Sequence, residues 1–351
     1  MRRLTTFLLL IFMATSAIKA QVEVEPKGFS NIIDWFGDID TAYIRPQTYN
    51  WQAMIKTVSS FDICNVDFID KHSPIKSASL STDPNLRIGP SFGWRFIFGG
   101  FSFDVIHNSP VNGRIKHEWE FSLYSSPLVV DLFYRRTGSD YRLRSVKMGE
   151  GITFGNINDV PFDAISLGIT GFNAFYVFNH RRFSIPAAMN QSTMQKISQG
   201  SWVAGFGYTH NKLDVDYVRL NDIVMNLAPV GYQFHMKDSA QLYTGLRYNN
   251  YSLHGGYAYN YVPCRNVLLS AMGTISLGYK HAKGRSQNDI HQRFSEYYFS
   301  PDANLRLAIV YNNMRWFVTL SGIIHTANFK TSQMDASNTF GMGTLCMGVN
   351  F

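Results

Sequence analysis

The chain has 351 residues, of which 15% are aromatic and 16% charged, and its formal net charge is +7 at pH 7. A basic excess of this size is too small to indicate a nucleic-acid partner, because nucleic acids are bound by concentrated cationic surfaces. The three cysteines, an odd number spread far apart, argue against a disulfide framework and are interpreted as small apolar fillers, with one pairing left open.

Residues 1–20 have the pattern of a secretory signal peptide. Arg2 and Arg3 form its basic region, an apolar run continues to Ile18, and cleavage is predicted before Gln21. The run is shorter than the roughly 20 apolar residues that a membrane anchor needs, so cleavage is favoured over anchoring. Without this leader the chain keeps 29 basic and 25 acidic residues, a net charge of +4.

Residues 21–50 do not alternate between apolar and polar positions. A short helix is predicted from Ser30, as its N-cap, to Gly37, as its stop signal. This stretch is interpreted as a short periplasmic N-terminal segment that precedes a barrel over residues 51–351.

Residues 88–98 give the clearest strand signal, because large apolar side chains occupy every second position. The opposite face carries small residues, which indicate a wet lumen, and the stretch has the length of a barrel wall strand. Gly99 and Gly100 are predicted to turn the chain into the next strand. The large side chains are Ile88, Pro90, Phe92, Trp94, Phe96 and Phe98.

The same alternation recurs to the end of the chain and predicts an all-β, transmembrane, antiparallel up-and-down barrel of about 14 strands. The count falls to about 12 if residues 51–64 and the short strand around Val230 are not in the wall. The predicted strands are 51–64, 88–98, 101–105, 117–123, 128–134, 165–179, 202–208, 230–234, 242–249, 251–261, 267–280, 305–311, 316–324 and 339–351.

The connections alternate between short and long, as in outer-membrane barrels with short periplasmic turns and long outer loops. Short turns are predicted near residues 99–100, 125–127, 236–239, 263–266 and 312–313, and long segments at 65–87, 136–162, 211–229, 281–303 and 326–339. If the first strand runs outward, the last strand returns to the periplasm. The terminal aromatic Phe351 is therefore predicted to be the signal that the barrel-assembly machinery reads.

Residues 180–200 break this asymmetry, because they are long and lie on the side of the short turns. One interpretation is a solvated periplasmic turn, whose arginines stop the chain from slipping inward. The other is a plug or constriction in the lumen, in which two arginines offer donors to anionic groups. The residues of this candidate site are Arg181, Arg182, Ser184, Asn190, Gln191 and Gln195.

This stretch also carries a family resemblance. Tyr176 to Asn179, Arg182 to Ser184, Asn190 to Ser192 and Gln195-Lys196 resemble an uncharacterised Bacteroidetes family, domain of unknown function 4421. The early residues 40–44 resemble the N-terminal segment of that family. The resemblance implies an outer-membrane barrel and brings no substrate, cofactor or catalytic residue.

No motif for catalysis, metal binding or a cofactor rises above chance, so we expect no cofactor and no metal site and favour a non-enzymatic protein over an enzyme. The nearest hydrolase-like arrangement is Ser252 with His254, two residues apart on one face of a strand. His210 lacks a nearby serine, and His107 with Ser109 in a predicted outer loop is a similarly weak pair.

The sequence therefore predicts an integral outer-membrane barrel that is a small pore or a structural envelope protein. The alternative is an enzyme that modifies lipid or lipopolysaccharide near the outer rim, and a secreted soluble sandwich is a third class. The expected partners are outer-membrane lipid, lipopolysaccharide and the assembly machinery, together with small solutes if the barrel conducts; nucleic acid is not expected.

Overall fold

The computed structural model describes residues 35–68, 75–83, 85–94, 97–105, 117–136, 141–148, 160–162, 165–215, 243–286, 293–330 and 334–351. The chain forms two compact units, Met1–Asp38 and Ile39–Phe351. Within the first unit, Trp35 and Phe36 lie in a helical turn, while Ser30 is outside the described residues. None of the described helices is long and apolar enough to cross a membrane.

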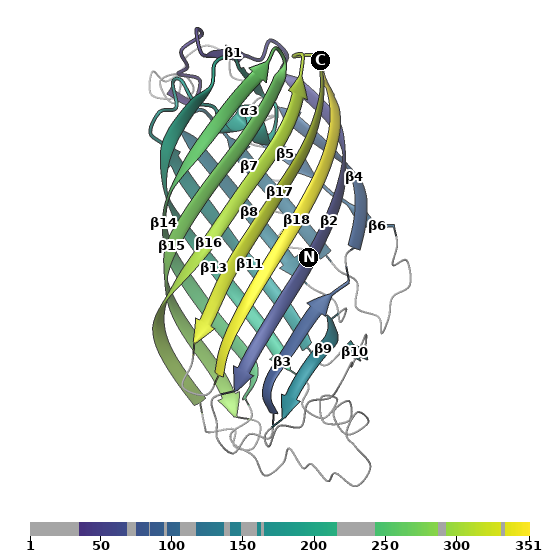
Figure 1. The fold of residues 1–351 in the computed structure, drawn as a ribbon, viewed down its shortest axis with the longest axis vertical. Helices are drawn as coiled ribbons and strands as arrows, with labels where there is room; N and C mark the ends of the chain where they lie inside the picture. Colours follow the sequence, from purple (N-terminus) through teal and green to yellow (C-terminus); the bar gives the residue numbers. More distant parts are fainter. Residues whose placement is uncertain are drawn as a thin grey trace, which may run out of the picture. The chain divides into compact units, whose positions relative to one another are not determined.

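Twelve antiparallel strands of the second unit close into a barrel, as Figure 1 shows. Their order around the wall is β2, β18, β17, β16, β15, β14, β13, β11, β8, β7, β5, β4 and back to β2. The bounds are β2 Trp51–Phe68, β4 Asn85–Trp94, β5 Ile97–Gly100, β7 His117–Tyr124, β8 Leu128–Arg136, β11 Ile165–Val177, β13 Gln199–Val215, β14 Tyr243–Cys264, β15 Val267–Ser286, β16 Arg293–Asn312, β17 Trp316–Lys330 and β18 Met334–Asn350.

The barrel closes between the first and last wall strands. β18 pairs with β2 from Met334 opposite Phe68 to Asn350 opposite Gln52. Beyond it, the Trp51 amide donates to the Phe351 carbonyl at 3.1 Å and the Phe351 amide donates to the Trp51 carbonyl at 3.0 Å. The end of the barrel at which these two residues meet is called the closed end below, because residues 178–198 fold into it; the opposite end is the far end.

Shorter strands complete the described part of the sheet. β2 pairs with β4 up to Ser60 and with β3 from Ile63 onward, so two strands share one neighbour. β3 leads on to β9 and β10, and β6 pairs with β4. Their bounds are β3 Ile75–Thr82, β6 Phe103–Asp104, β9 Tyr141–Met148 and β10 Val160–Phe162.

The predicted all-β barrel is confirmed, and its wall has twelve strands. A count of twelve was expected only if residues 51–64 were outside the wall, but these residues are in the wall as β2. The count falls by one because residues 242–249 and 251–261, predicted as two strands, form the single strand β14. The predicted strand around Val230 lies outside the described residues.

Two connections differ from the prediction. Trp94 pairs with Ile97, so the chain reverses before Gly99 and Gly100, which lie in β5. A Cβ at Gly100 would lie 2.6 Å from the Ser91 hydroxyl, so this glycine permits close strand approach rather than a turn. At the far end, β15 and β16 extend to Ser286 and Arg293, and β17 and β18 to Lys330 and Met334, through much of the predicted loops.

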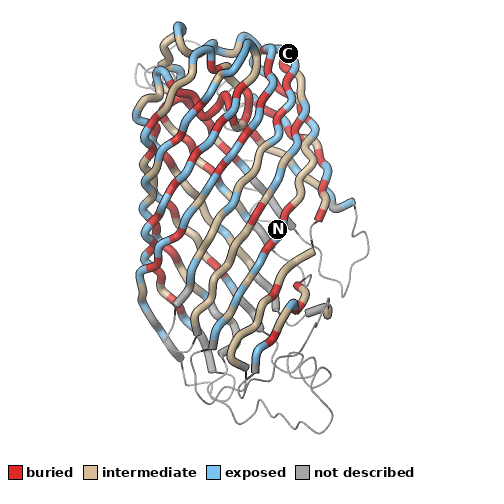
Figure 2. Tube along the Cα trace, in the orientation of Figure 1, coloured by how far each residue is buried: buried red, intermediate tan, exposed pale blue. Residues whose placement is uncertain are grey.

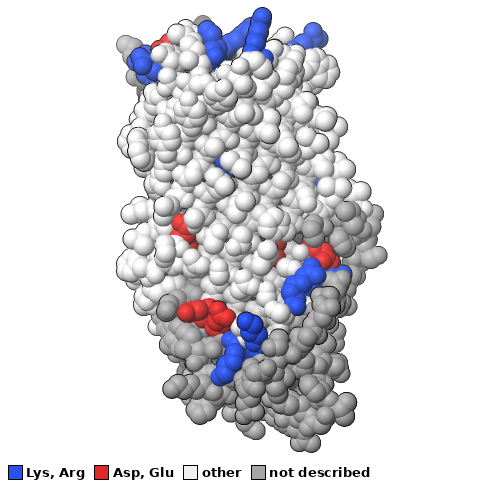
Figure 3. Space-filling view, viewed as in Figure 1, with Lys and Arg blue, Asp and Glu red and all other residues white. Residues whose placement is uncertain are grey.

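The outer face of the wall is apolar. Large exposed side chains project from it on many strands, among them Phe92, Leu253, Ile275, Leu307 and Met347. In Figure 3, Lys and Arg gather at the upper, closed end, and a broad band with few charged atoms separates them from the mixed charges below. Buried stretches concentrate near the closed end in Figure 2.

Deleting Phe351 should impair barrel assembly and leave export intact, because both backbone hydrogen bonds to Trp51 are lost at the closing seam. The folded fraction is measured by heat-modifiable migration in gels, and export by cleavage of the leader. A Phe351→Trp variant, which keeps the backbone and an aromatic ring, should assemble normally. Normal assembly of the deletion variant would show that Phe351 is not an assembly signal.

Candidate functional site: a plug in the closed end

The connection between β11 and β13 folds into the closed end of the barrel, and we call residues 178–198 the plug. It contains the short helix α3, Ile185–Met189, and the strand β12, Thr193–Gln195 (Figure 1). Ser184 caps α3, because its hydroxyl accepts from the Ala187 amide at 3.2 Å. Pro186 fits the first turn, where no intrahelical donor is required, so the sequence sets this helix locally.

An apolar core holds the plug inside the wall. Phe183 and Ile185 are 1% and 4% exposed and pack within one cluster of buried side chains. Ten wall strands contribute to that cluster, so the two side chains lie within the ring of strands. The other buried members are Met54, Phe98, Tyr124, Val129, Phe175, Val177, Val203, Ala258, Met272, Phe317 and Cys346.

A second apolar cluster holds the helix itself. Ala187 and Ala188 of α3 pack against Leu268 of β15 and Val310 of β16. The small inward residues of the strands indicated a wet lumen. At the closed end the lumen is instead filled by apolar side chains. Burial of each large side chain contributes about 1.5–3 kcal/mol, so a plug with several such groups is firmly seated.

Two asparagines of the wall bind the backbone of the plug. The Asn260 amide of β14 donates to the Ser184 carbonyl at 2.8 Å and to the Gln195 side-chain oxygen at 3.2 Å. The Asn312 amide of β16 donates to the carbonyls of Gln191 and Thr193, both at 3.4 Å. These bonds satisfy polar groups that the apolar surroundings would otherwise leave unpaired.

Gln195 organises the interior of the plug. Its side-chain amide donates to the Arg182 carbonyl at 2.7 Å and to the Ile197 carbonyl at 3.0 Å. Its side-chain oxygen accepts from the Ser184 amide at 3.0 Å. One glutamine side chain therefore ties the start of the plug to its end.

An N-terminal strand covers the plug. β1, Ile44–Pro46, pairs with β12, with Ile44 opposite Gln195. The Asp40 amide donates to the Arg181 carbonyl at 2.7 Å, and the Lys196 ammonium donates to the Thr41 carbonyl at 2.9 Å. The two stretches that carry the family resemblance, residues 40–44 and the plug, are thus in direct contact.

The structure divides the predicted site residues into two groups. Ser184, Gln191 and Gln195 are at most 3% exposed, and Asn190 is 4% exposed. Arg181 and Arg182 are exposed at the surface of the closed end. Their binding of anionic groups stays a prediction.

Arg182 already has contacts at that surface. Its guanidinium lies 3.8 Å from an Asp40 carboxylate oxygen and 5.0 Å from the centre of the Tyr43 ring. These neighbours lie just before β1, 139 and 142 positions earlier in the chain, so the sequence around Arg182 does not reveal them.

The predicted site does not include the wall residues that bind the plug. Asn260 and Asn312 have 0% and 3% exposure. The sequence does carry a signal for Asn260: it occupies an inward position of a strand whose outward positions are tyrosines. A buried amide needs a hydrogen-bond partner, so an inward asparagine indicates that something polar lies inside the barrel.

A second barrier crosses the lumen beyond the plug. Arg306 of β16 and Asp131 of β8 form an ion pair at 3.0 Å, with side-chain exposures of 8% and 9%. Four wall strands separate β16 from β8 on one side and six on the other, so the pair bridges the barrel. The Arg306 guanidinium also lies 5.7 Å from the centre of the Phe175 ring.

Ser252 and His254 form a hydrogen-bonded pair in the middle of β14, with the Ser252 hydroxyl 2.8 Å from His254 Nε2. The other ring nitrogen, Nδ1, has no hydrogen-bond partner among the described residues, so a third group that would orient the ring is not seen. His210 instead contacts Asn249 at 2.8 Å, and His107 lies outside the described residues.

The described residues contain no group of three or more side chains suited to hold a metal ion. All three cysteines are free, with Cys346 buried and Cys264 exposed.

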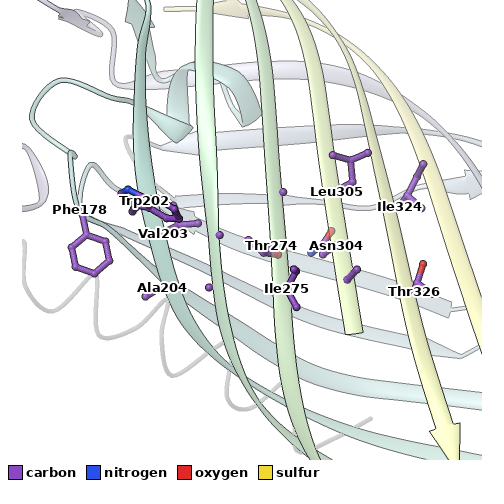
Figure 4. Close-up of a pocket in the computed structure, with 14 residues that line it drawn as sticks. Phe178, Trp202, Val203, Ala204, Thr274, Ile275, Asn304, Leu305, Ile324 and Thr326 are labelled. Atoms are coloured by element: carbon purple, nitrogen blue, oxygen red, sulfur yellow. The ribbon is translucent and has the colours of Figure 1, made fainter. Parts of the chain in front are cut away.

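A shallow apolar groove of about 770 Å³ lies across β13 to β17 (Figure 4). Its lining includes Ala204, Gly255 and Gly273, positions with small or no side chains, beside the exposed Trp202 and Ile275. The groove is on the outer face of the wall, and Phe178, the first residue of the plug, forms part of its lining.

A family model described as Domain of unknown function (DUF4421) matches residues 38–351. No curated protein matches the sequence. Among solved structures, the outer membrane protease OmpT from Escherichia coli is 9% identical with a TM-score of 0.37, covering 86% of this chain and 97% of that one. The Pseudomonas putida toluene transporter TodX is 11% identical with a TM-score of 0.21, covering 86% and 90%. These likenesses assign no activity to the chain.

Replacing Asn260 by alanine should destabilise the folded protein by about 1–3 kcal/mol, because buried acceptors of the plug lose their donor. The midpoint of denaturant unfolding measures the change, and proteolysis within residues 178–198 measures exposure of the plug. Asn249→Ala, on the outward face of the same strand, is the control and should leave proteolysis unchanged. Equal proteolysis of Asn260→Ala and the unmodified protein would show that Asn260 does not anchor the plug.

Proposed function

The chain belongs to the DUF4421 family, whose description names no activity, and we propose from its geometry that it is an integral outer-membrane barrel held shut by its own plug. The observation that carries this proposal is the burial of Phe183 and Ile185 inside a cluster built from ten wall strands. In this role it is a closed structural protein of the envelope rather than an open pore.

The outer face supports the membrane placement. Its large exposed side chains are apolar, and the charged groups of the visible face gather toward the two ends (Figure 3). A closed barrel leaves no unpaired strand edge, which is the condition for strands to span lipid. The proposed location is the outer membrane, reached by export with the N-terminal leader.

The connections support the orientation. At the closed end, β7 and β8 are separated by only residues 125–127, and β14 and β15 by residues 265–266. At the far end β17 and β18 are also joined by a short connection, residues 331–333, but β13 and β14 are joined by residues 216–242. The long connections belong to the outer side of such barrels and the short turns to the periplasmic side. The closed end, with residues 39–46, is therefore proposed to face the periplasm, and the assembly machinery to read Phe351 there.

Two barriers in series support the closed state. Small solutes would have to displace the plug, which is held by two apolar clusters and by Asn260 and Asn312. They would also have to pass the Arg306–Asp131 ion pair, which crosses the lumen. Opening either barrier alone leaves the other in place.

In planar bilayers the unmodified barrel should show no steady conductance. A variant with residues 180–198 replaced by a short turn, combined with Arg306→Ser and Asp131→Ser, should conduct, because both barriers are gone. The matched control carries only Arg306→Ser and Asp131→Ser and should stay closed. Steady conductance of the unmodified protein would overturn the proposal and favour a small pore.

A second candidate function rests on the Ser252–His254 contact of 2.8 Å. This pair is the proton-transfer unit of a serine nucleophile, which would act on an ester of a lipid or lipopolysaccharide. The sequence led us to expect this pair near the outer rim, but it lies in the middle of β14. A substrate must therefore enter the lumen to reach it.

If this candidate is correct, purified barrel incubated with phospholipid will release fatty acid, and Ser252→Ala and His254→Ala will each abolish the release. Removing the nucleophile or its base typically costs several orders of magnitude in rate. His210→Ala, on the outer face, is the control and should keep full activity. No release above a blank by the unmodified barrel excludes this activity on phospholipid.

A further inference from the structure

Toward the far end, the outer face of the wall carries successive rows of side chains that differ in chemistry. One row of neighbouring positions across five strands carries only aromatic side chains, and ring centres of Tyr208 and Tyr251 lie 5.0 Å apart. Such a belt is typical of the level at which a membrane interior meets the lipid headgroups. The row consists of Phe172, Tyr208, Tyr251, Tyr279 and Phe299.

The row two residues farther along each strand is polar. His210, Asn249 and His281 are its members on β13, β14 and β15. Asn249 accepts from the Tyr208 hydroxyl at 2.9 Å, and the His281 ring stacks on the Tyr297 ring at 4.1 Å. Hydrogen-bonding groups thus follow the aromatic belt directly.

The next row is cationic. Lys212 pairs with Arg247, and Arg247 pairs with Lys283, so three basic residues occupy adjacent positions on three neighbouring strands. All three are exposed. Three cations on adjacent strands concentrate positive charge at one place on the outer face, to which a polyanion is attracted.

We infer that Lys212, Arg247 and Lys283 form a site for the phosphate groups of the membrane lipid that surrounds the far end. The row lies four residues beyond the aromatic belt, which is about 13 Å along a strand. Phosphate groups sit just outside the hydrocarbon at that level, so the spacing fits a lipid whose chains rest against the belt. The inference rests on the proposed membrane placement.

The geometry favours a lipid phosphate over a free one. The three cations are exposed on the outer face of the wall, where the acyl chains of a lipid also find apolar side chains such as Leu253 and Leu277. Arg247, at the centre, offers a planar fork for two phosphate oxygens, and the flanking lysines act as point charges. A diphosphorylated glycolipid uses all of these contacts together.

The test measures binding of lipid A to the purified full-length barrel in zwitterionic detergent. The variant Lys212→Gln, Arg247→Gln, Lys283→Gln should bind about fivefold more weakly for each removed cation. The matched control is Arg45→Gln, Arg265→Gln, Arg315→Gln, which removes three exposed cations of the closed end and should keep unmodified affinity. Heat-modifiable migration verifies that both variants fold.

Three results would overturn the inference: unchanged binding by the far-end variant, equal loss in both variants, or displacement of lipid A by an equal concentration of inorganic phosphate. The last would identify a free-phosphate site, and the second a general attraction between charges. Failure of the membrane placement is distinguishable, because the unmodified protein would then be absent from the outer-membrane fraction.

Discussion

The antiparallel pairing of β2 with β18 is the constraint on which the rest of the molecule depends. It joins residues 266 to 298 positions apart, from Phe68 with Met334 to Gln52 with Asn350. Without it the sheet would have two long free edges, whose backbone groups lipid cannot satisfy. Closure also gives the sheet an inner and an outer face. Along each wall strand, side chains then point alternately into the lumen, toward the plug, and out from the barrel.

The interior that results has two zones with different chemistry. Around Phe183 and Ile185 the inward side chains are apolar, and the plug packs as a small protein core does. Farther from the closed end, buried ion pairs such as Arg306–Asp131 and Lys280–Asp302 replace that packing. Breaking one partner of such a pair leaves a buried charge, so this zone resists substitution for a different reason from the core.

The period-two pattern predicts the fold well because it reports directly on which side chains face outward. It does not report where one strand ends, so Asn249 and Asn250 resemble a turn although β14 continues through them. Gly99 and Gly100 resemble a turn although both lie in β5, and at Gly100 close approach of the neighbouring strand favours glycine as strongly as a tight turn would.

The plug was detectable because residues 180–200 interrupt the alternation on the side of the short turns. Which of its side chains are buried was not predictable, since that depends on residues far away in sequence. Asp40 and Tyr43 lie beside Arg182 at the surface, whereas Asn260 reaches Ser184 in the interior. The polar residues look alike in the sequence, and only the wall around them distinguishes anchors from surface groups.

The position of the plug along the chain constrains the order of folding. It belongs to the hairpin of β11 and β13 in the middle of the sequence, and β1, which covers it, comes just before the first wall strand. The barrel closes when its first and last wall strands, β2 and β18, pair with each other. Before the seam closes, the hairpin can bring its plug inward from the side; after closure, α3 and its buried neighbours can enter only along the barrel axis, through the closed end.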